Sequence, residues 1–168
     1  MYISLFISRI IMYRAVLILV LVATVWADDD KCRKARGPAG MHCCTEHPPP
    51  PDKDMDLKEC FEMDHEPHTC AREKCIADKK GFHAGNGEVD KVAYEANIEN
   101  NFKDDSELKQ NIIQKCVKGD LSTYGPPDDC ELMKIQHCTH FQIMAAKCNG
   151  WKDEGECSGM AELVKECS

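Results

Sequence analysis

Twelve cysteines in a chain of 168 residues limit what this chain can fold into more than any other feature. They are Cys32, Cys43, Cys44, Cys60, Cys70, Cys75, Cys116, Cys130, Cys138, Cys148, Cys157 and Cys167. An even number of cysteines in an exported chain is typical of a disulfide framework, here about six bonds. Zinc is the other common use of cysteine, but no pair has the two-residue spacing of a zinc knuckle. We therefore expect disulfides, with no metal site and no cofactor.

The first 27 residues have the order of a secretory signal peptide. Arg9 and Arg14 precede an apolar run over residues 15–25, and Ala27 ends a small-residue site before three aspartates. The apolar run is shorter than the roughly 20 residues that span a bilayer. We expect a secreted, extracellular chain with no membrane contact after cleavage. Met12 is an alternative start, because residues 12–27 form a complete signal by themselves.

Charge excludes several classes of partner. The predicted mature chain keeps all 29 acidic residues but loses Arg9 and Arg14, two of the 21 basic ones, so its net charge falls from −8 to −10. An acidic chain is a poor partner for the phosphates of nucleic acid or of anionic lipid. Four consecutive prolines, Pro48 to Pro51, favour an extended backbone. Residues 28–53 are therefore predicted to be a proline-rich arm ahead of a helical domain over residues 54–168.

Apolar residues in the rest of the chain recur at helical spacing, and no segment alternates like a strand. Helices are expected within residues 54–66, 70–81, 88–97, 104–119, 128–150 and 158–167. Gly81 is expected to cap the second of them in the left-handed conformation. Asp104 with Glu107, and Asp128 with Glu131, have the spacing of capping boxes. The predicted fold is all-α, with five to seven short helices stapled by disulfides.

No motif in the sequence indicates a catalytic site. The run Cys43-Cys44-Thr45-Glu46-His47 looks like the core of secreted phospholipase A2, but that family needs an acid where this chain has Pro48. His137 and His140 are spaced to bind a metal or to sense pH, but no carboxylate has an obvious place beside them in the sequence, so we interpret them as ordinary surface histidines. Nucleophile-elbow, zinc-protease and phosphate-loop motifs are absent from the sequence. We interpret the chain as a protein that is not an enzyme.

The apolar faces of the helices permit two readings. Val89, Val92, Ala93 and Ala96 have 3–4 spacing and are predicted to face inward. Disulfides stabilise a fold by about 2–4 kcal/mol each, so a stapled frame tolerates an internal cavity that binds a small hydrophobic molecule. The same residues would equally fill one another's space. The pattern alone leaves both readings open.

The cysteine spacing points to a known family. Cys70-x4-Cys75-x40-Cys116, followed by Cys138-x9-Cys148-x8-Cys157, resembles the framework of insect odorant-binding proteins, and residues 75–90 resemble their third-to-fourth helix passage. The vicinal Cys43-Cys44 ahead of prolines, the added cysteines and the tail ending at Cys167 are similar to the Plus-C subgroup. That family usually has three residues, where this chain has four, between Cys70 and Cys75. The longer spacing places these two residues about 140° apart around a helix, so they would face different neighbours.

The resemblance implies the pairs Cys44–Cys75, Cys70–Cys148 and Cys116–Cys157, with Cys138–Cys167 tying down the tail. It implies a secreted carrier, monomeric or homodimeric, that binds small hydrophobic odorants or pheromones in an apolar cavity and delivers them to chemosensory receptors. The expected pocket residues are Val89, Val92, Ala96, Leu108, Ile112, Leu132, Ile135, Phe141, Met144 and Leu163. The alternative is a secreted, disulfide-rich interaction or defence protein with a filled core.

Overall fold

The computed structural model describes residues 31–48, 56–63, 70–83 and 88–168. The predicted signal peptide lies outside these residues. The described part is helical and contains only two isolated bridges, Cys44 with Trp151 and His83 with Val89, and no strand. The all-α prediction is confirmed. No described helix combines the length and the apolar character that a membrane span requires.

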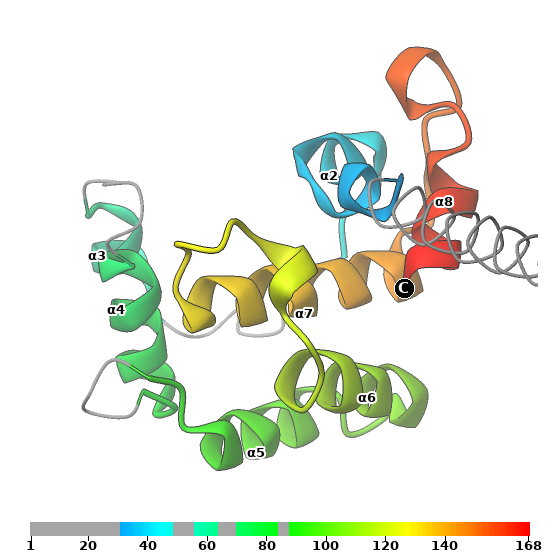
Figure 1. The fold of residues 1–168 in the computed structure, drawn as a ribbon. Coiled ribbons are helices and arrows are strands. Elements are labelled where there is room, and N and C mark those ends of the chain that lie inside the picture. The colour runs from blue at the N-terminus through cyan, green and yellow to red at the C-terminus, as the bar shows by residue number, and fades with distance from the viewer. Residues whose placement is uncertain (1–30, 49–55, 64–69, 84–87) are drawn as a thin grey trace, which may run out of the picture.

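The longest of the described helices, α7 (Glu131–Lys147), runs through the middle of the molecule, and helical segments that precede and follow it in the sequence pack against it (Figure 1). Residues 31–36 form a first helical stretch. It is followed by α2 (Pro38–Cys43), α3 (Lys58–Phe61), α4 (Ala71–Lys80), α5 (Lys91–Asn101), α6 (Ser106–Ile112), the π-helical turn η1 (Ile113–Val117), the 3₁₀ turn η2 (Ser122–Tyr124), α7 (Glu131–Lys147), the 3₁₀ turn η3 (Gly155–Cys157) and α8 (Met160–Cys167).

The segment before the prolines differs from the extended arm that the sequence predicted. Residues 31–36 and α2 are helical, and α2 packs against α8 and η3 at the other end of the chain (Figure 1). A proline in the first turn of a helix is favourable, because that position needs no amide hydrogen, and α2 begins in this way. The prolines that exclude a helix begin only at Pro48. The N-terminal segment is therefore part of the folded body.

Three nested disulfides join the N-terminal segment to the C-terminal one. Cys32 bonds Cys167, Cys43 bonds Cys157 and Cys44 bonds Cys148. Backbone hydrogen bonds from Thr45 N to Gly150 O (2.7 Å) and from Lys152 N to Cys43 O (2.9 Å) continue the same antiparallel contact. We define these two joined segments, residues 31–47 and 148–168, as the terminal layer.

The other three disulfides link helices of the central part: Cys60–Cys75, Cys70–Cys130 and Cys116–Cys138. All twelve cysteines are bonded, as the composition predicted. The four pairings implied by the family resemblance, Cys44–Cys75, Cys70–Cys148, Cys116–Cys157 and Cys138–Cys167, are wrong. A disulfide needs Cα atoms within roughly 7 Å, and the docking of the chain ends brings the C-terminal cysteines to the N-terminal segment instead.

The four-residue spacing between Cys70 and Cys75 has the expected consequence. Cys70 lies just before α4 in a left-handed conformation (φ 53°) and bonds Cys130, whereas Cys75 lies within α4 and bonds Cys60 of α3. The two cysteines therefore tie α4 to different neighbours. At its other end α4 stops at Gly81, whose φ of 75° confirms the predicted left-handed cap.

The helix starts were predicted less well. The side chain of Asp90 accepts hydrogen bonds from the Val92 and Ala93 amides, so α5 begins after the loop that was expected to hold its first turn. Asp105, and not Asp104, caps α6 by accepting from the Leu108 amide. α7 begins after Cys130 with no side-chain cap, so the predicted Asp128–Glu131 capping box is wrong. At the start of α7, Cys130 is held by its disulfide with Cys70 and not by a side-chain cap.

Candidate functional site

The helices α4 to α8 share one buried apolar cluster, and most of the predicted pocket residues lie in it. Val89, Leu108, Ile112, Leu132, Ile135 and Phe141 belong to this cluster, Met144 is buried on α7, and Leu163 is half-buried against the cluster. Further members that were not among the predicted pocket residues are Phe82, Tyr94, Ile98, Ile113, Val117, Tyr124, Met160 and Val164. We call this cluster the apolar interior.

Two of the predicted pocket residues lie outside it. Val92 is 81% exposed and Ala96 is exposed, so neither lines an internal pocket. The predicted stripe assumed that α5 starts before Val89, but the cap at Asp90 starts the helix later and leaves Val89 in the preceding loop. Tyr94 and Ile98, one turn apart, form the inward face of α5. The regular spacing of these two residues was the signal that could have identified the correct face.

The apolar interior contains one hydrogen-bonded pair of hydroxyl groups. Tyr94 Oη and Thr139 Oγ1 lie 2.8 Å apart, which joins α5 to α7, and Tyr94 also packs edge-on against the ring of Phe82. Buried hydroxyl groups are tolerated when they pair in this way. Gln142, one turn further along α7 from Thr139, is only 2% exposed. Sequence reasoning missed all four residues as contributors to the site.

Arg36 of the terminal layer covers one side of the apolar interior. Its guanidinium carbon lies 4.8 Å from the ring centre of Tyr124 and 5.9 Å from that of Phe141, distances at which a cation and an aromatic ring attract. A guanidinium nitrogen of Arg36 also donates to the Cys167 carbonyl (3.2 Å). The terminal layer thus closes over η2 and α7 through a charged group as well as through disulfides.

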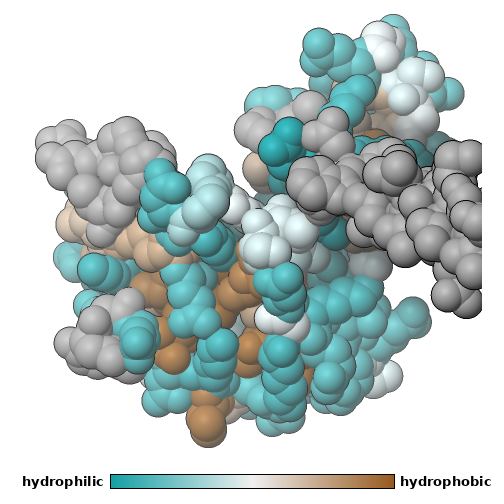
Figure 2. Space-filling view, viewed as in Figure 1, coloured by the Kyte–Doolittle hydropathy of each residue, from teal (hydrophilic) through white to brown (hydrophobic). Residues whose placement is uncertain are grey.

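Hydrophobic residues are visible at the surface on another side of the apolar interior. Figure 2 shows them between α4, α5 and α7, with hydrophilic residues around them. These hydrophobic residues reach the surface at separate points among hydrophilic ones.

A separate open groove lies between α3 and α4. It has a volume of about 450 Å³ and is lined by Glu59, Met63, Cys75, Asp78 and Lys79. The Lys79 ammonium lies 3.0 Å from the Glu59 carboxylate and so ties the two helices together across it. On the same side of the molecule, Phe61 and Met63 are 63% and 40% exposed.

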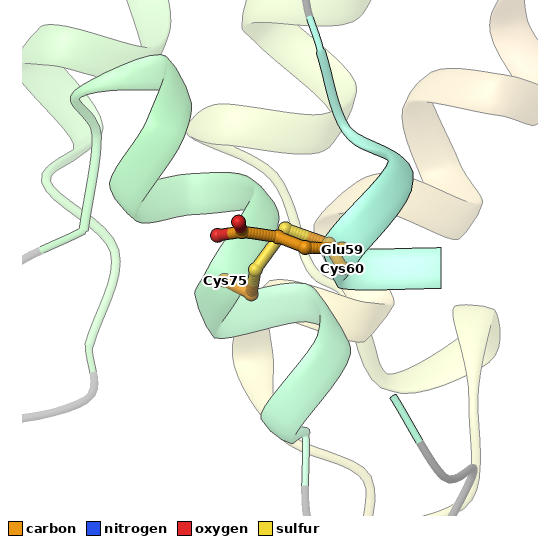
Figure 3. A group of neighbouring side chains, drawn as sticks. All are labelled: Glu59, Cys60 and Cys75. Carbon is orange, nitrogen blue, oxygen red and sulfur yellow. A yellow bond between two sulfur atoms is a disulfide. The ribbon is translucent and has the colours of Figure 1, made fainter. Parts of the chain in front are cut away.

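The groove also holds a group of three potential metal ligands. Glu59, Cys60 and Cys75 bring a carboxylate oxygen and two sulfur atoms within 4.8 Å of one another (Figure 3). The two sulfur atoms form a disulfide, however, and the thiolate is the form of cysteine that binds a metal. With this disulfide formed, Glu59 is the one member of this group of three that keeps a ligand atom for a metal.

His137 and His140, which have the spacing of a metal-binding pair, lie on α7 near the terminal layer. His137 Nδ1 lies 3.1 Å from the Tyr124 carbonyl oxygen in η2. When Nδ1 carries a proton, the ring donates a hydrogen bond to this oxygen. Burial, and then the nearby His47 and His137, lower the pKa of His140. The contact of His137 with the Tyr124 carbonyl joins α7 to η2.

Comparison with protein-family models, with curated proteins and with solved structures finds no match to this chain.

Proposed function

We propose that the chain is a secreted carrier that binds small hydrophobic molecules in its apolar interior. The observation that carries the proposal is a single apolar interior, enclosed by helices from distant parts of the sequence and held by six disulfides. A ligand buried there gains about 25 cal/mol for each Å² of apolar surface removed from water, and no catalytic group is needed.

Three further points support this proposal. Six disulfides fit an extracellular protein, as the predicted signal peptide requires. A ligand would enter where hydrophobic residues reach the surface between α4, α5 and α7 (Figure 2). The resemblance of the cysteine spacing to insect odorant-binding proteins supplies the finer proposal, which is transport of odorants or pheromones to chemosensory receptors by a monomer or homodimer. The observed disulfide pairings differ from those that the resemblance implies, and the apolar interior is the main support for a carrier.

The test is displacement of the fluorescent probe N-phenyl-1-naphthylamine by medium-chain alcohols, ketones and alkanes. The proposal expects saturable probe binding that such ligands reverse. Ile135→Ala, at a fully buried interior position, is expected to change ligand affinity severalfold, because it alters the volume and shape of the site. Val92→Ala is the matched control, since Val92 is 81% exposed, and it should leave affinity unchanged. A wild-type protein without saturable binding would rule the carrier function out.

The second candidate is a secreted interaction or defence protein. The exposed side chains of Phe61 and Met63 beside the α3–α4 groove favour it, because a partner would bury them. Phe61→Ser distinguishes the two candidates in the same assay. Loss of probe binding in Phe61→Ser, with Ile135→Ala unaffected, would place the binding site at the groove and support the second candidate.

A further inference from the structure

The buried face of α7 carries no charged group but two polar ones. Its buried residues are Leu132, Ile135, Cys138, Thr139, Phe141, Gln142 and Met144. The part of α7 around Gln142 is fixed against the preceding helices at both ends. The Cys116–Cys138 disulfide joins it to η1 on one side, and the ion pair of Lys147 with Asp105 joins it to the start of α6 on the other. Gln142 thus lies buried on the stretch of α7 that packs against α6 and η1.

The two polar groups differ in their hydrogen bonding. The Thr139 hydroxyl is paired with that of Tyr94 at 2.8 Å. The Nε2 atom of Gln142 is fully buried and has no hydrogen-bond partner among the described residues. A buried donor without a partner costs about 1–3 kcal/mol, and an apolar side chain of the same length would avoid this cost. We therefore expect the Gln142 amide, on an otherwise largely apolar buried face, to donate its hydrogen bond to a ligand.

The chemistry of the site defines that partner. A primary amide nitrogen only donates hydrogen bonds, so the ligand must present an acceptor. The buried face of α7 has no charge to balance an ionised ligand, and burying an unpaired charge is far more costly than burying a neutral dipole. We propose that Gln142 is the specificity-determining residue for a neutral, elongated apolar ligand that ends in a carbonyl oxygen, such as a ketone, an aldehyde or an ester. This inference rests on the proposed carrier function and names its ligand class.

The test compares two ligands in two proteins. A medium-chain methyl ketone and the alkane of the same length compete for the fluorescent probe in the wild type and in Gln142→Met, which keeps the side-chain length and removes the amide. One hydrogen bond is worth about 0.5–1.5 kcal/mol net. We therefore expect Gln142→Met to weaken ketone binding by roughly threefold to tenfold and to leave alkane binding unchanged.

A second readout separates this role from a structural one. Because the Gln142 Nε2 has no hydrogen-bond partner among the residues that the structure describes, Gln142→Met should unfold at the same denaturant concentration as the wild type or a higher one. A clear loss of stability with the ketone-to-alkane ratio unchanged would show that the amide supports the fold, and would overturn the inference. An equal loss of affinity for the ketone and for the alkane in Gln142→Met would also overturn the inference. If neither ligand displaces the probe from the wild type, the carrier function itself fails, and the inference fails with it.

Discussion

The surroundings of His140 on α7 lower the pKa of its imidazole. Partial burial is the main cause, and the nearby His47 and His137 lower this pKa further. His47 follows the Cys44–Cys148 disulfide, which fixes the N-terminal segment beside the end of α7. Because the folded pKa lies below the model value of 6.5, the unfolded chain takes up this proton first as the pH falls.

We predict a contribution of His140 to acid sensitivity. Its contribution to stability is fully present above about pH 6.5 and is lost as the pH falls through the lowered folded pKa. His140→Gln removes the titrating group, so its stability should fall less steeply with acid than that of the wild type. Denaturant unfolding over a series of pH values below neutrality measures both slopes. Parallel curves for the two proteins would contradict the prediction.

At the scale of the elements, helix starts depend on which of two neighbouring residues forms the cap. Asp105 accepts from the Leu108 amide and forms an ion pair with Lys147, and hydrogen bonds to these two groups lower its pKa, that to Lys147 most. Asp104, which the sequence favoured, is exposed. The sequence contains an acid at both positions, and only the packing of α6 against α7 decides between them.

We predict unequal effects of removing the two acids. Asp105→Ala should lower the free energy of unfolding by about 1 kcal/mol or somewhat more, because both the cap and the ion pair are lost. Asp105→Asn keeps an acceptor for the Leu108 amide and should cost less. The matched control, Asp104→Ala, is expected to stay within about 0.5 kcal/mol of the wild type. Denaturant unfolding measures all three, and equal losses at the two aspartates would refute the assignment of the cap.

For the whole molecule, the terminal layer organises the fold. Its three disulfides have sequence separations of 135, 114 and 104, and they are nested, so the inner two already bring the chain ends together. The outermost bond, Cys32–Cys167, is accompanied by an ion pair of Lys31 with Glu166 at 2.8 Å. Once the inner bonds exist, this bond closes only a ring of roughly 20 residues.

We predict that the double variant Cys32→Ser with Cys167→Ser loses about 3 kcal/mol of stability under non-reducing conditions. An isolated disulfide of the same sequence separation would contribute about 5 kcal/mol by chain entropy. The matched control is Cys60→Ser with Cys75→Ser, whose separation of 15 also corresponds to about 3 kcal/mol. A clearly larger loss at the outer bond than at Cys60–Cys75 would show that the nested disulfides act independently.

Features that depend on composition and on nearby residues could be predicted from the sequence. Twelve cysteines required a bonded framework, helical periodicity required an all-α fold, and Gly81 marked the end of α4. The residues of longer apolar stripes, such as Ile112 and Leu132, were placed correctly in the interior. These features depend on composition and on neighbours within one or two helical turns.

Only the tertiary structure decided which cysteines pair, because pairing depends on Cα distances between segments that are far apart in the chain. Because residues 31–47 dock on residues 148–168, Cys44 forms a disulfide with Cys148, and Cys75 forms one with Cys60. Tertiary packing also set the register of α5, which turned Val92 outward and Tyr94 inward. It buried the Gln142 Nε2 atom with no hydrogen-bond partner in the described part of the chain. Hydrogen-bond partners and burial are properties of contacts between elements, and one-dimensional patterns do not contain them.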